Sequence, residues 1–135
     1  MKHMKKILAL MLVLCFMAVI PLSASASSSY DTYVIGNWTA YEIYDSDTGV
    51  SKGVEEGACL LYVYSDGTAK LVSGTTIYPG RWSYSRTDSS GYWFTFNIST
   101  GNGSAPVEFV YMTYGGYEGF VILYLVNYQF IFQKA

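Results

Sequence analysis

The sequence predicts an all-β fold, a small antiparallel up-and-down β-barrel of about eight short strands, with a β-sandwich as the alternative. Apolar residues alternate in twos along most of residues 36–135, and no convincing 3.6-residue stripe accompanies them. Turn residues recur about every eight to twelve positions, which is the spacing of short antiparallel strands. The chain also holds 14 Tyr, 7 Phe and 3 Trp. Such rings suit a small core because each buries about 150–250 Å².

The first 26 residues are expected to lie outside this fold. Three lysines precede an uncharged apolar run over residues 7–20, and small residues occupy positions 24–26. This order is typical of a secretory signal peptide that is cleaved after Ala26. The apolar run is shorter than the roughly 20 residues that cross a bilayer, so no stable membrane insertion is expected after cleavage. We therefore expect a secreted bacterial protein, extracellular or in the cell envelope, with a tail over residues 27–35 and a barrel domain over residues 36–135.

The predicted mature chain is acidic. Three of the eight basic residues precede Ala26 and all ten acidic residues follow it, which leaves five basic residues, ten acidic residues and a net charge of −5. Binding of phosphate groups needs a clustered basic face, and the remaining basic residues are scattered along the sequence. Nucleic acid and anionic membrane surfaces are therefore not expected partners.

Histidine and cysteine are almost absent from the predicted mature chain, which excludes several kinds of chemistry. His3 is the only histidine and lies within the signal, so a Ser/His/Asp or Cys/His nucleophile and a histidine-bound zinc are excluded. Cys59 is the one cysteine after Ala26, so no internal disulfide can form. Cys59 lies in an apolar run and is expected to face the core, with a reactive or intermolecular thiol as the alternative.

Acidic residues after the first expected strand give one weak metal motif. Asp45, Asp47 and Glu56 match positions 1, 3 and 12 of a calcium loop. Position 5 needs an oxygen ligand and position 6 needs glycine, but Gly49 and Val50 stand there instead. We expect a solvated loop with no metal, and nothing else in the sequence indicates a cofactor or an enzymatic activity.

Turn and loop signals divide residues 36–135 into the expected strands. An acidic stretch over residues 45–57 is expected to form a long loop after the first strand. Ser65-Asp66-Gly67-Thr68 favours a tight hairpin, because Asp-Gly tolerates the positive φ that such a turn needs. Pro79-Gly80 indicates a loop before the fourth strand, and Gly-rich segments over residues 99–104 and 114–119 indicate two more.

The strands between these turns differ in how strictly they alternate. Phe94 and Phe96 alternate with polar neighbours, as do Phe130 and Phe132, which gives each of these two strands a core face and a wet face. Residues 120–126 are apolar on both faces. Their second face is therefore exposed, as scattered apolar residues often are, or covered by a partner subunit, another segment of the chain or a bound apolar ligand. In order, the expected strands span residues 38–44, 58–64, 69–72, 81–85, 92–98, 107–113, 120–126 and 128–133.

Four segments occur in an order that is found in one known family. They are Gly36-Asn37-Trp38, Ser65-Asp66-Gly67-Thr68, Gly80-Arg81-Trp82 and the closing residues 130–134. This order resembles the small secreted lipocalin-like (calycin-type) domains of bacteria. The resemblance implies that Trp38 plugs the closed end of a barrel, that Lys134 packs over it, and that Gly36, Gly80 and Trp82 are structural. The chain departs from true lipocalins in its shorter length, and Thr87-Asp88 does not complete their Thr-Asp-x-x-Tyr motif.

The resemblance also implies a function, which is non-catalytic binding of a small apolar or amphipathic ligand at the open end of the barrel. Glu42 alternates with Trp38 and is therefore expected to point into the barrel, where its carboxylate needs a polar partner. Tyr78, Tyr114 and Tyr117 lie on expected loops and are predicted to contact the ligand or a partner.

A second function stays open at this point, because the interior of an eight-stranded barrel can also be filled by its own side chains. The protein would then be a protease inhibitor or a surface adhesin that binds a protein or sugar through exposed Tyr-rich loops, as antibody loops do. Residues 27–34 could form the inserted tail of such an inhibitor. The sequence leaves the oligomeric state and the identity of the ligand or partner open.

Overall fold

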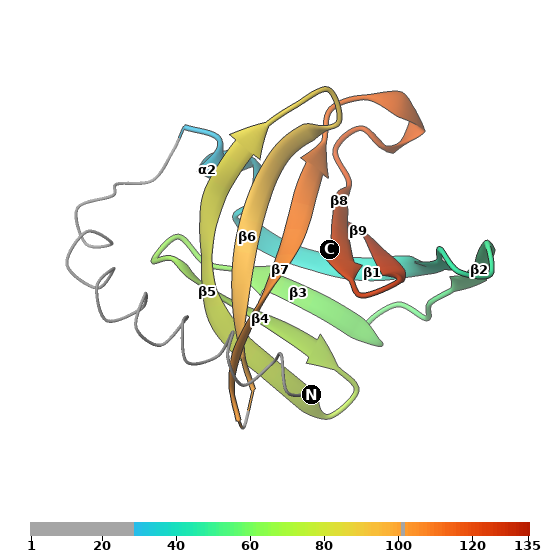
Figure 1. The fold of residues 1–135 in the computed structure, drawn as a ribbon, viewed down its shortest axis with the longest axis horizontal. Coiled ribbons are helices and arrows are strands. Elements are labelled where there is room, and N and C mark those ends of the chain that lie inside the picture. Colours follow the sequence, from blue (N-terminus) through green and yellow to red (C-terminus); the bar gives the residue numbers. More distant parts are fainter. Residues whose placement is uncertain (1–28, 101) are drawn as a thin grey trace.

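The computed structural model describes residues 29–135 with the exception of residue 101 (Figure 1). The predicted signal peptide, residues 1–26, lies outside the described residues. Eight antiparallel strands close into a barrel and one further strand, β2, pairs on its outside, which confirms the predicted fold class. The strands are β1 (Gly36–Asp45), β2 (Val50–Gly53), β3 (Cys59–Val63), β4 (Thr68–Ser73), β5 (Thr76–Thr87), β6 (Gly91–Thr100), β7 (Gly103–Met112), β8 (Val121–Leu125) and β9 (Tyr128–Lys134).

The barrel closes because β1 has neighbours on both sides. Its first half pairs with β3 on one side, and its second half pairs with β2 on that same side. On the other side β1 pairs with β9, from Trp38 opposite Lys134 to Asp45 opposite Tyr128. The strands from β3 to β9 each pair with the next one in sequence. Within the described residues, β2 is therefore the only strand that pairs with a single neighbour.

Alternate residues of the eight barrel strands point inward and form one apolar core, as the two-residue period predicts. The helix α2 (Asp31–Val34) adds Val34 to this core from outside the barrel strands. The fully buried members with large side chains include four phenylalanines and one tryptophan. These are Trp38, Phe94, Phe96, Phe109 and Phe132.

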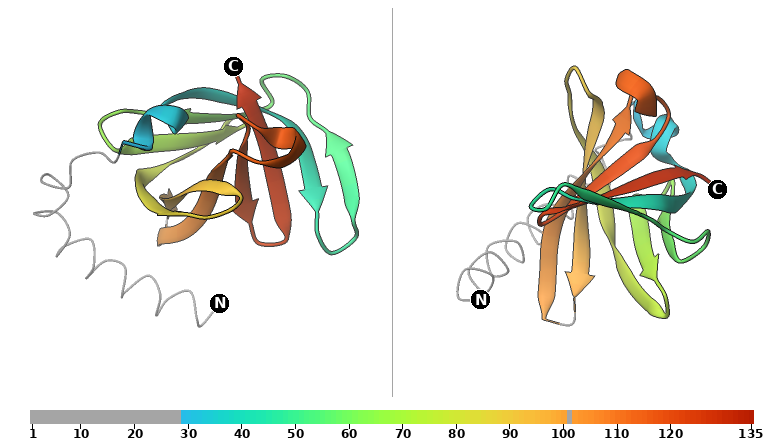
Figure 2. Two further views of the ribbon diagram at one scale, coloured as in Figure 1. Left: turned by 90° about the horizontal axis from the view of Figure 1, so that it is seen from above. Right: turned by 90° about the vertical axis from the view of Figure 1, so that its right-hand side faces the viewer.

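The two ends of the barrel are built differently. At one end, which we call the closed end, α2 lies beside the start of β1, together with the β3–β4 and β5–β6 turns (Figures 1 and 2). The β7–β8 loop, which contains the 3-10 helix η1 (Gly115–Tyr117), lies at this end as well. The opposite end, which we call the open end, carries the β1–β2, β4–β5, β6–β7 and β8–β9 turns.

Three predicted loops are shorter in the structure than the sequence indicates. The acidic segment over residues 45–57 contains β2, and the segment over residues 99–104 is a tight hairpin in which Thr100 pairs with Gly103. Pro79-Gly80 lies inside β5 and not in a loop. Pro79 is tolerated there because the pairing of β5 with β6 begins only at Gly80, so proline stands where β5 is an edge.

Candidate functional site

The centre of the barrel is filled by its own side chains. Phe94, Phe96, Phe109 and Phe132 are each 0 % exposed, and Trp38 is 1 % exposed. A side chain with no exposed area adjoins no space large enough for a water molecule, so these rings are packed against protein atoms on all sides. A ligand therefore has no room beside these five rings.

Trp38 anchors the closed end to the segment that precedes the barrel. Its indole N–H donates a 2.8 Å hydrogen bond to the backbone carbonyl of Val34, at the end of α2. The Nζ of Lys134 lies 4.7 Å from the centroid of the Trp38 ring and donates a 3.0 Å hydrogen bond to the carbonyl of Ile35. Gly36 leaves room for this arrangement, because a Cβ there would lie 2.5 Å from Lys134 Nζ. Trp38 and Lys134 together thus hold residues 34 and 35, which lead into β1, against the barrel.

The second Gly-x-Trp makes a comparable arrangement on β5. The indole N–H of Trp82 donates a 2.9 Å hydrogen bond to the carbonyl of Tyr64, at the start of the β3–β4 turn. Gly80 faces the backbone of Asn97 and the ring of Phe96, and a Cβ at Gly80 would overlap both. Gly80 is therefore needed for close packing of β5 on β6.

Five tyrosine rings form a continuous cluster at the closed end, which we call the tyrosine cluster. Tyr30 contacts Tyr84 and Tyr92 at centroid distances of 5.0 and 4.5 Å, and Tyr33 contacts Tyr92 and Tyr111 at 4.9 and 5.2 Å. Partial desolvation and the neighbouring Tyr33 raise the pKa of Tyr92 above its usual value. Because Tyr30 and Tyr33 belong to the predicted tail, residues 30–34 are packed on the barrel, which does not favour an inhibitor tail that inserts into a protease.

The outer face of β7, β8 and β9 carries a second, smaller apolar cluster, which we call the outer cluster. Its buried centre is Val110, Ile122 and Ile131. Side chains of the same chain cover this centre, so the second apolar face of residues 120–126 is covered from within the domain. The covering residues are Tyr41, Trp93, Met112, Phe120 and Tyr124.

The prediction that Glu42 points into the barrel is wrong, and the cause is a β-bulge in β1. The pairing of β1 with β9 shifts by one residue between Ala40 and Glu42. Ala40 faces the core opposite Phe132, but Glu42 lies opposite Ile131, which belongs to the outer cluster. One extra residue in a strand reverses the face of every residue after it. The Glu42 carboxylate is therefore on the outside, where water can solvate it.

The structure places the other three predicted binding residues at two separate sites. Tyr114 and Tyr117 lie on the β7–β8 loop at the closed end and are exposed, Tyr114 by 73 %. Tyr78 lies at the opposite end, inside β5 and not in a loop. Its pairing with the core residue Leu71 puts it on the inner face of the barrel. The four residues therefore do not form one site.

Side chains on the inner face become steadily more exposed toward the open end. Along β9, Phe132 is fully buried, Phe130 is half-buried and Tyr128 is 41 % exposed. On β5, Tyr78 is 37 % exposed although it faces inward. We call this end of the inner face the mouth. Its floor is Cys59, Leu71 and Ile98, its half-buried wall is Ile43, Val107, Leu125 and Phe130, and its rim is Tyr78 and Tyr128.

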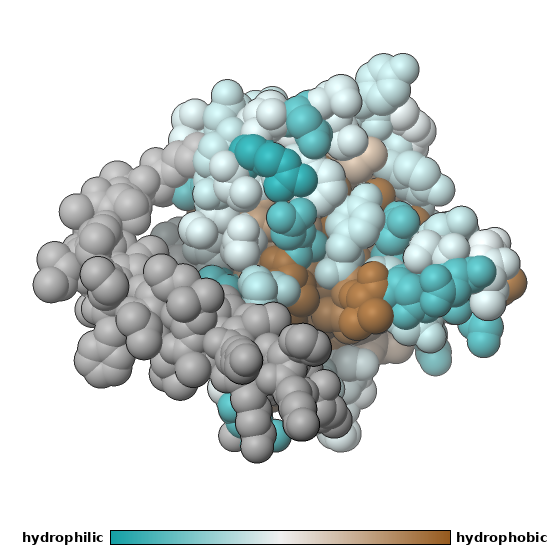
Figure 3. Space-filling view, in the orientation of Figure 1, coloured by the Kyte–Doolittle hydropathy of each residue, from teal (hydrophilic) through white to brown (hydrophobic). Residues whose placement is uncertain are grey.

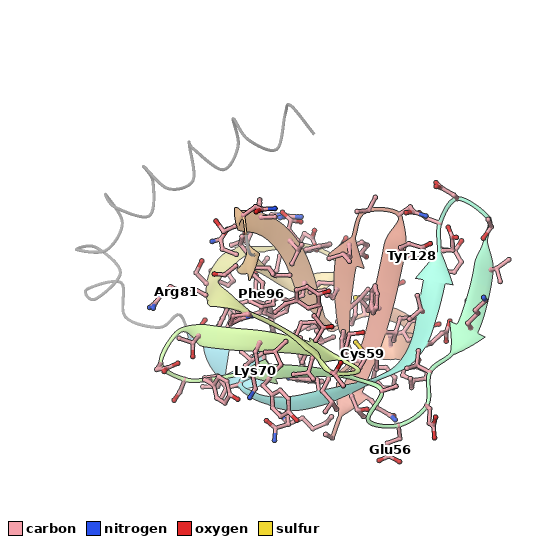
Figure 4. All side chains as sticks on the ribbon, turned by 90° about the horizontal axis from the view of Figure 1, so that it is seen from below. Glu56, Cys59, Lys70, Arg81, Phe96 and Tyr128 are labelled. Carbon is pink, nitrogen blue, oxygen red and sulfur yellow. The ribbon has the colours of Figure 1, made fainter. Side chains whose placement is uncertain are left out.

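The mouth is the best candidate site, because apolar side chains there meet solvent, and no other residue among those that the structure describes covers them as α2 covers the closed end. Figure 4 shows this end from below, with Tyr128 beside the β8–β9 turn and Cys59 closer to the barrel interior. Tyr128 shares the inner face with Leu125, opposite which it pairs. The two rim tyrosines each combine a ring with a hydroxyl, so they can contact the apolar and the polar part of one ligand.

The chemistry of the floor is inert. Burial raises the pKa of the Cys59 thiol to about 11, so the reactive thiolate is scarce at neutral pH.

The possible calcium loop begins at Asp45. Its carboxylate accepts hydrogen bonds from the backbone N–H of Asp47 and the side chain of Asn127. The residues that the structure describes contain no grouping of acidic, cysteine or histidine side chains arranged to hold a metal ion.

Among the described residues there is no helix with the length and apolar character that a membrane crossing requires. Comparisons of the chain with protein-family models, with curated proteins and with solved structures find no match. The barrel geometry is therefore the basis for the functional argument.

Proposed function

We propose that this protein is a secreted, non-catalytic binding module that holds the apolar part of a small amphipathic molecule at the mouth. The observation that carries this proposal is the gradient of exposure along the inner face, from fully buried Phe132 through half-buried Phe130 to exposed Tyr128. The exposed side chains at this end of the inner face offer apolar surface that a ligand could cover. A hollow barrel would expose the phenylalanines at its centre, which are 0 % exposed.

The ligand of this proposal lies on top of the filled core and not within it. Its apolar part would contact Val107, Leu125 and Phe130, which are half-buried and would lose more contact with water on binding. Its polar part would remain at the rim, beside the hydroxyls of Tyr78 and Tyr128. The position of this shallow site at the open end fits the resemblance to lipocalin-like domains. A shallow site buries a smaller fraction of the ligand surface than a deep cavity does.

Neighbouring residues on β5 give a matched test. Tyr78 faces inward opposite Leu71, whereas Ile77 faces outward opposite Val72, and both are exposed. The protein released by a secreting host is titrated with the fluorescent apolar probe N-phenyl-1-naphthylamine. We expect saturable binding that Tyr78→Ser weakens about tenfold, equivalent to ~1.4 kcal/mol, and that Ile77→Ser leaves unchanged. Absence of saturable binding, or equal effects of the two substitutions, would contradict the proposal.

Exposed tyrosines at the closed end favour protein recognition as a second candidate function. Tyr33, Tyr64, Tyr114 and Tyr117 are exposed there, and tyrosine provides large contact area at low entropic cost. The β7–β8 loop would then serve as the contact surface of a protease inhibitor or adhesin. Inhibition of a secreted metalloprotease such as thermolysin tests the inhibitor form of this idea. Tyr114→Ser should abolish any inhibition, and Tyr78→Ser should not change it.

A further inference from the structure

Exposed aliphatic side chains occur at only one of the two barrel ends among the described residues, whereas exposed tyrosines occur at both. Among the described residues, the exposed large hydrophobic side chains at the closed end are all tyrosines, namely Tyr33, Tyr64, Tyr114 and Tyr117. The exposed aliphatic side chains are all at the open end, on three different hairpins. They are Val50 at the start of β2, Ile77 at the start of β5 and Val126 in the β8–β9 turn.

Val126 is the most exposed of these side chains and its backbone is strained. It is 97 % exposed, and its φ of 57° is in the left-handed region that β-branched residues avoid. The turn is held in place on its other side. Asn127 donates a 3.0 Å hydrogen bond to the Asp45 carboxylate, and its carbonyl accepts 2.9 and 2.8 Å bonds from the N–H and hydroxyl of Ser46. A fixed turn thus presents an aliphatic side chain to the outside at a cost in conformational energy.

On two hairpins of the open end, the exposed aliphatic side chain lies closer to the turn than the rim tyrosine. Val126 lies in the turn before Tyr128, and Ile77 precedes Tyr78 at the start of β5. Figure 3 shows apolar surface near the β8–β9 turn, next to the polar surface of the β1–β2 hairpin. Aliphatic side chains on the outside with tyrosines directly behind them match the layers of a bilayer surface, where tyrosine lies at the level of the headgroups.

Charge at the open end restricts which lipid surface fits. The β1–β2 hairpin and the β2–β3 segment carry Asp47, Glu55 and Glu56, against one lysine, Lys52. Acidic side chains repel anionic headgroups, whose attraction depends on clusters of lysine and arginine. The surface that fits is therefore uncharged or zwitterionic.

We infer that the open end docks end-on to an uncharged or zwitterionic lipid surface, through Val50, Ile77 and Val126, and that the ligand of the mouth is an amphipathic lipid that passes between this surface and the barrel. The second half of this inference rests on the proposed function, because it takes the mouth as the binding site. The first half is independent of it. Three hairpins around the mouth would contact the surface together, so a lipid could move into the mouth without crossing open water.

Partition into lipid vesicles tests the docking surface. The protein released by a secreting host is sedimented with vesicles of phosphatidylcholine alone and with vesicles that also contain phosphatidylglycerol. We expect measurable partition into the first and weaker partition into the second. Val126→Asn should reduce partition roughly fivefold, because it removes one aliphatic side chain that docking would bury in the lipid surface. Asparagine tolerates the left-handed backbone at this position, so the turn itself should be kept. The matched control is Tyr114→Asn at the closed end, which should leave partition unchanged.

Several results would overturn the inference. These are no partition into phosphatidylcholine, stronger partition into the anionic vesicles, or an equal effect of Tyr114→Asn. A dimer in solution that Val126→Asn converts to a monomer would assign the same surface to a second copy instead. The naphthylamine probe separates this inference from the proposed function. Val126→Asn should still bind the probe, so a protein that binds the probe but not vesicles refutes the docking alone, and the reverse result refutes the mouth as a ligand site.

Discussion

The indole N–H of Trp38 lies 2.8 Å from the backbone carbonyl oxygen of Val34, four residues earlier in the chain. Trp82 makes a bond of the same kind, 2.9 Å long, to the carbonyl of Tyr64. The two acceptors differ in environment, because Val34 is fully buried and Tyr64 is exposed. The Tyr64 carbonyl also accepts a 3.3 Å hydrogen bond from the N–H of Gly67, so the bond from the indole matters less there than at Val34.

Removal of the indole N–H should cost more at Trp38 than at Trp82. Trp38→Phe leaves the Val34 carbonyl without this partner in a buried site, which costs about 1–3 kcal/mol, whereas the Tyr64 carbonyl still accepts a hydrogen bond from the N–H of Gly67 after Trp82→Phe. Urea unfolding followed by circular dichroism measures both changes. Equal losses of unfolding free energy would show that the bond to Val34 is not special.

Gly80 is predicted to be irreplaceable for a steric reason. Gly80→Ala places a methyl group against Asn97 and Phe96, and we expect a loss of about 1–3 kcal/mol in unfolding free energy, as is usual for overpacking. The control is Gly53→Ala on β2, where a Cβ would meet nothing within 4 Å. That variant should unfold at the same denaturant concentration as the parent, and a comparable loss there would point to strand propensity instead.

Val126→Asn is expected to stabilise the protein. The left-handed backbone costs an L-residue with a branched side chain about 1–2 kcal/mol, and asparagine adopts it more readily. Thermal unfolding should therefore show a higher midpoint for this variant. A lower midpoint would mean that the exposed valine contributes packing that its 97 % exposure does not indicate.

Cys59 should make the protein less stable at high pH. Burial raises the pKa of its thiol from 9.0 to about 11, so the folded state retains a proton that the unfolded chain loses first. Stability linked to this proton is complete below pH 9 and is lost as the pH rises toward 11, by about 2 kcal/mol. Unfolding free energies measured across this range should fall less steeply in Cys59→Ala, which removes the thiol and leaves every other ionisable side chain in place.

The predicted signal peptide can be tested directly by expression in a secreting host. We expect the released protein to begin at Ser27, which intact mass and N-terminal sequencing would show. A retained N-terminus, or a lipid attached near it, would contradict the expected cleavage after Ala26.

The strands could be predicted because large apolar residues at every second position report burial directly. Phe94 with Phe96 and Phe130 with Phe132 show this pattern; three of these rings are buried in the core, and Phe130 packs against it. The position of Pro79 inside β5 could not be predicted from local signals, because the sequence around a proline at a strand edge does not differ from that around a proline in a loop. Whether an edge exists at that point depends on where β6 ends.

Most of the candidate site could not be predicted, because it depends on contacts between distant segments. Glu42 was expected inside because alternation was continued through a bulge, and no residue type near Tyr41 marks that extra position. The mouth combines side chains from all eight barrel strands, so no spacing in the sequence connects them. The one available signal was the high tyrosine content, which indicates amphipathic surfaces but not their positions.

The pairing of β1 with β9 has a consequence for how the protein is made. Trp38 pairs with Lys134, and the N–H of Ala135 donates a 2.9 Å hydrogen bond to the carbonyl of Asn37. β1 is the first barrel strand to be synthesised, and it therefore lacks one neighbour until β9, the last barrel strand, has been synthesised. Until then the inward-facing rings have no closed wall around them. A chain that leaves the ribosome or a translocation channel in order can complete this barrel only after residues 133–135 have emerged.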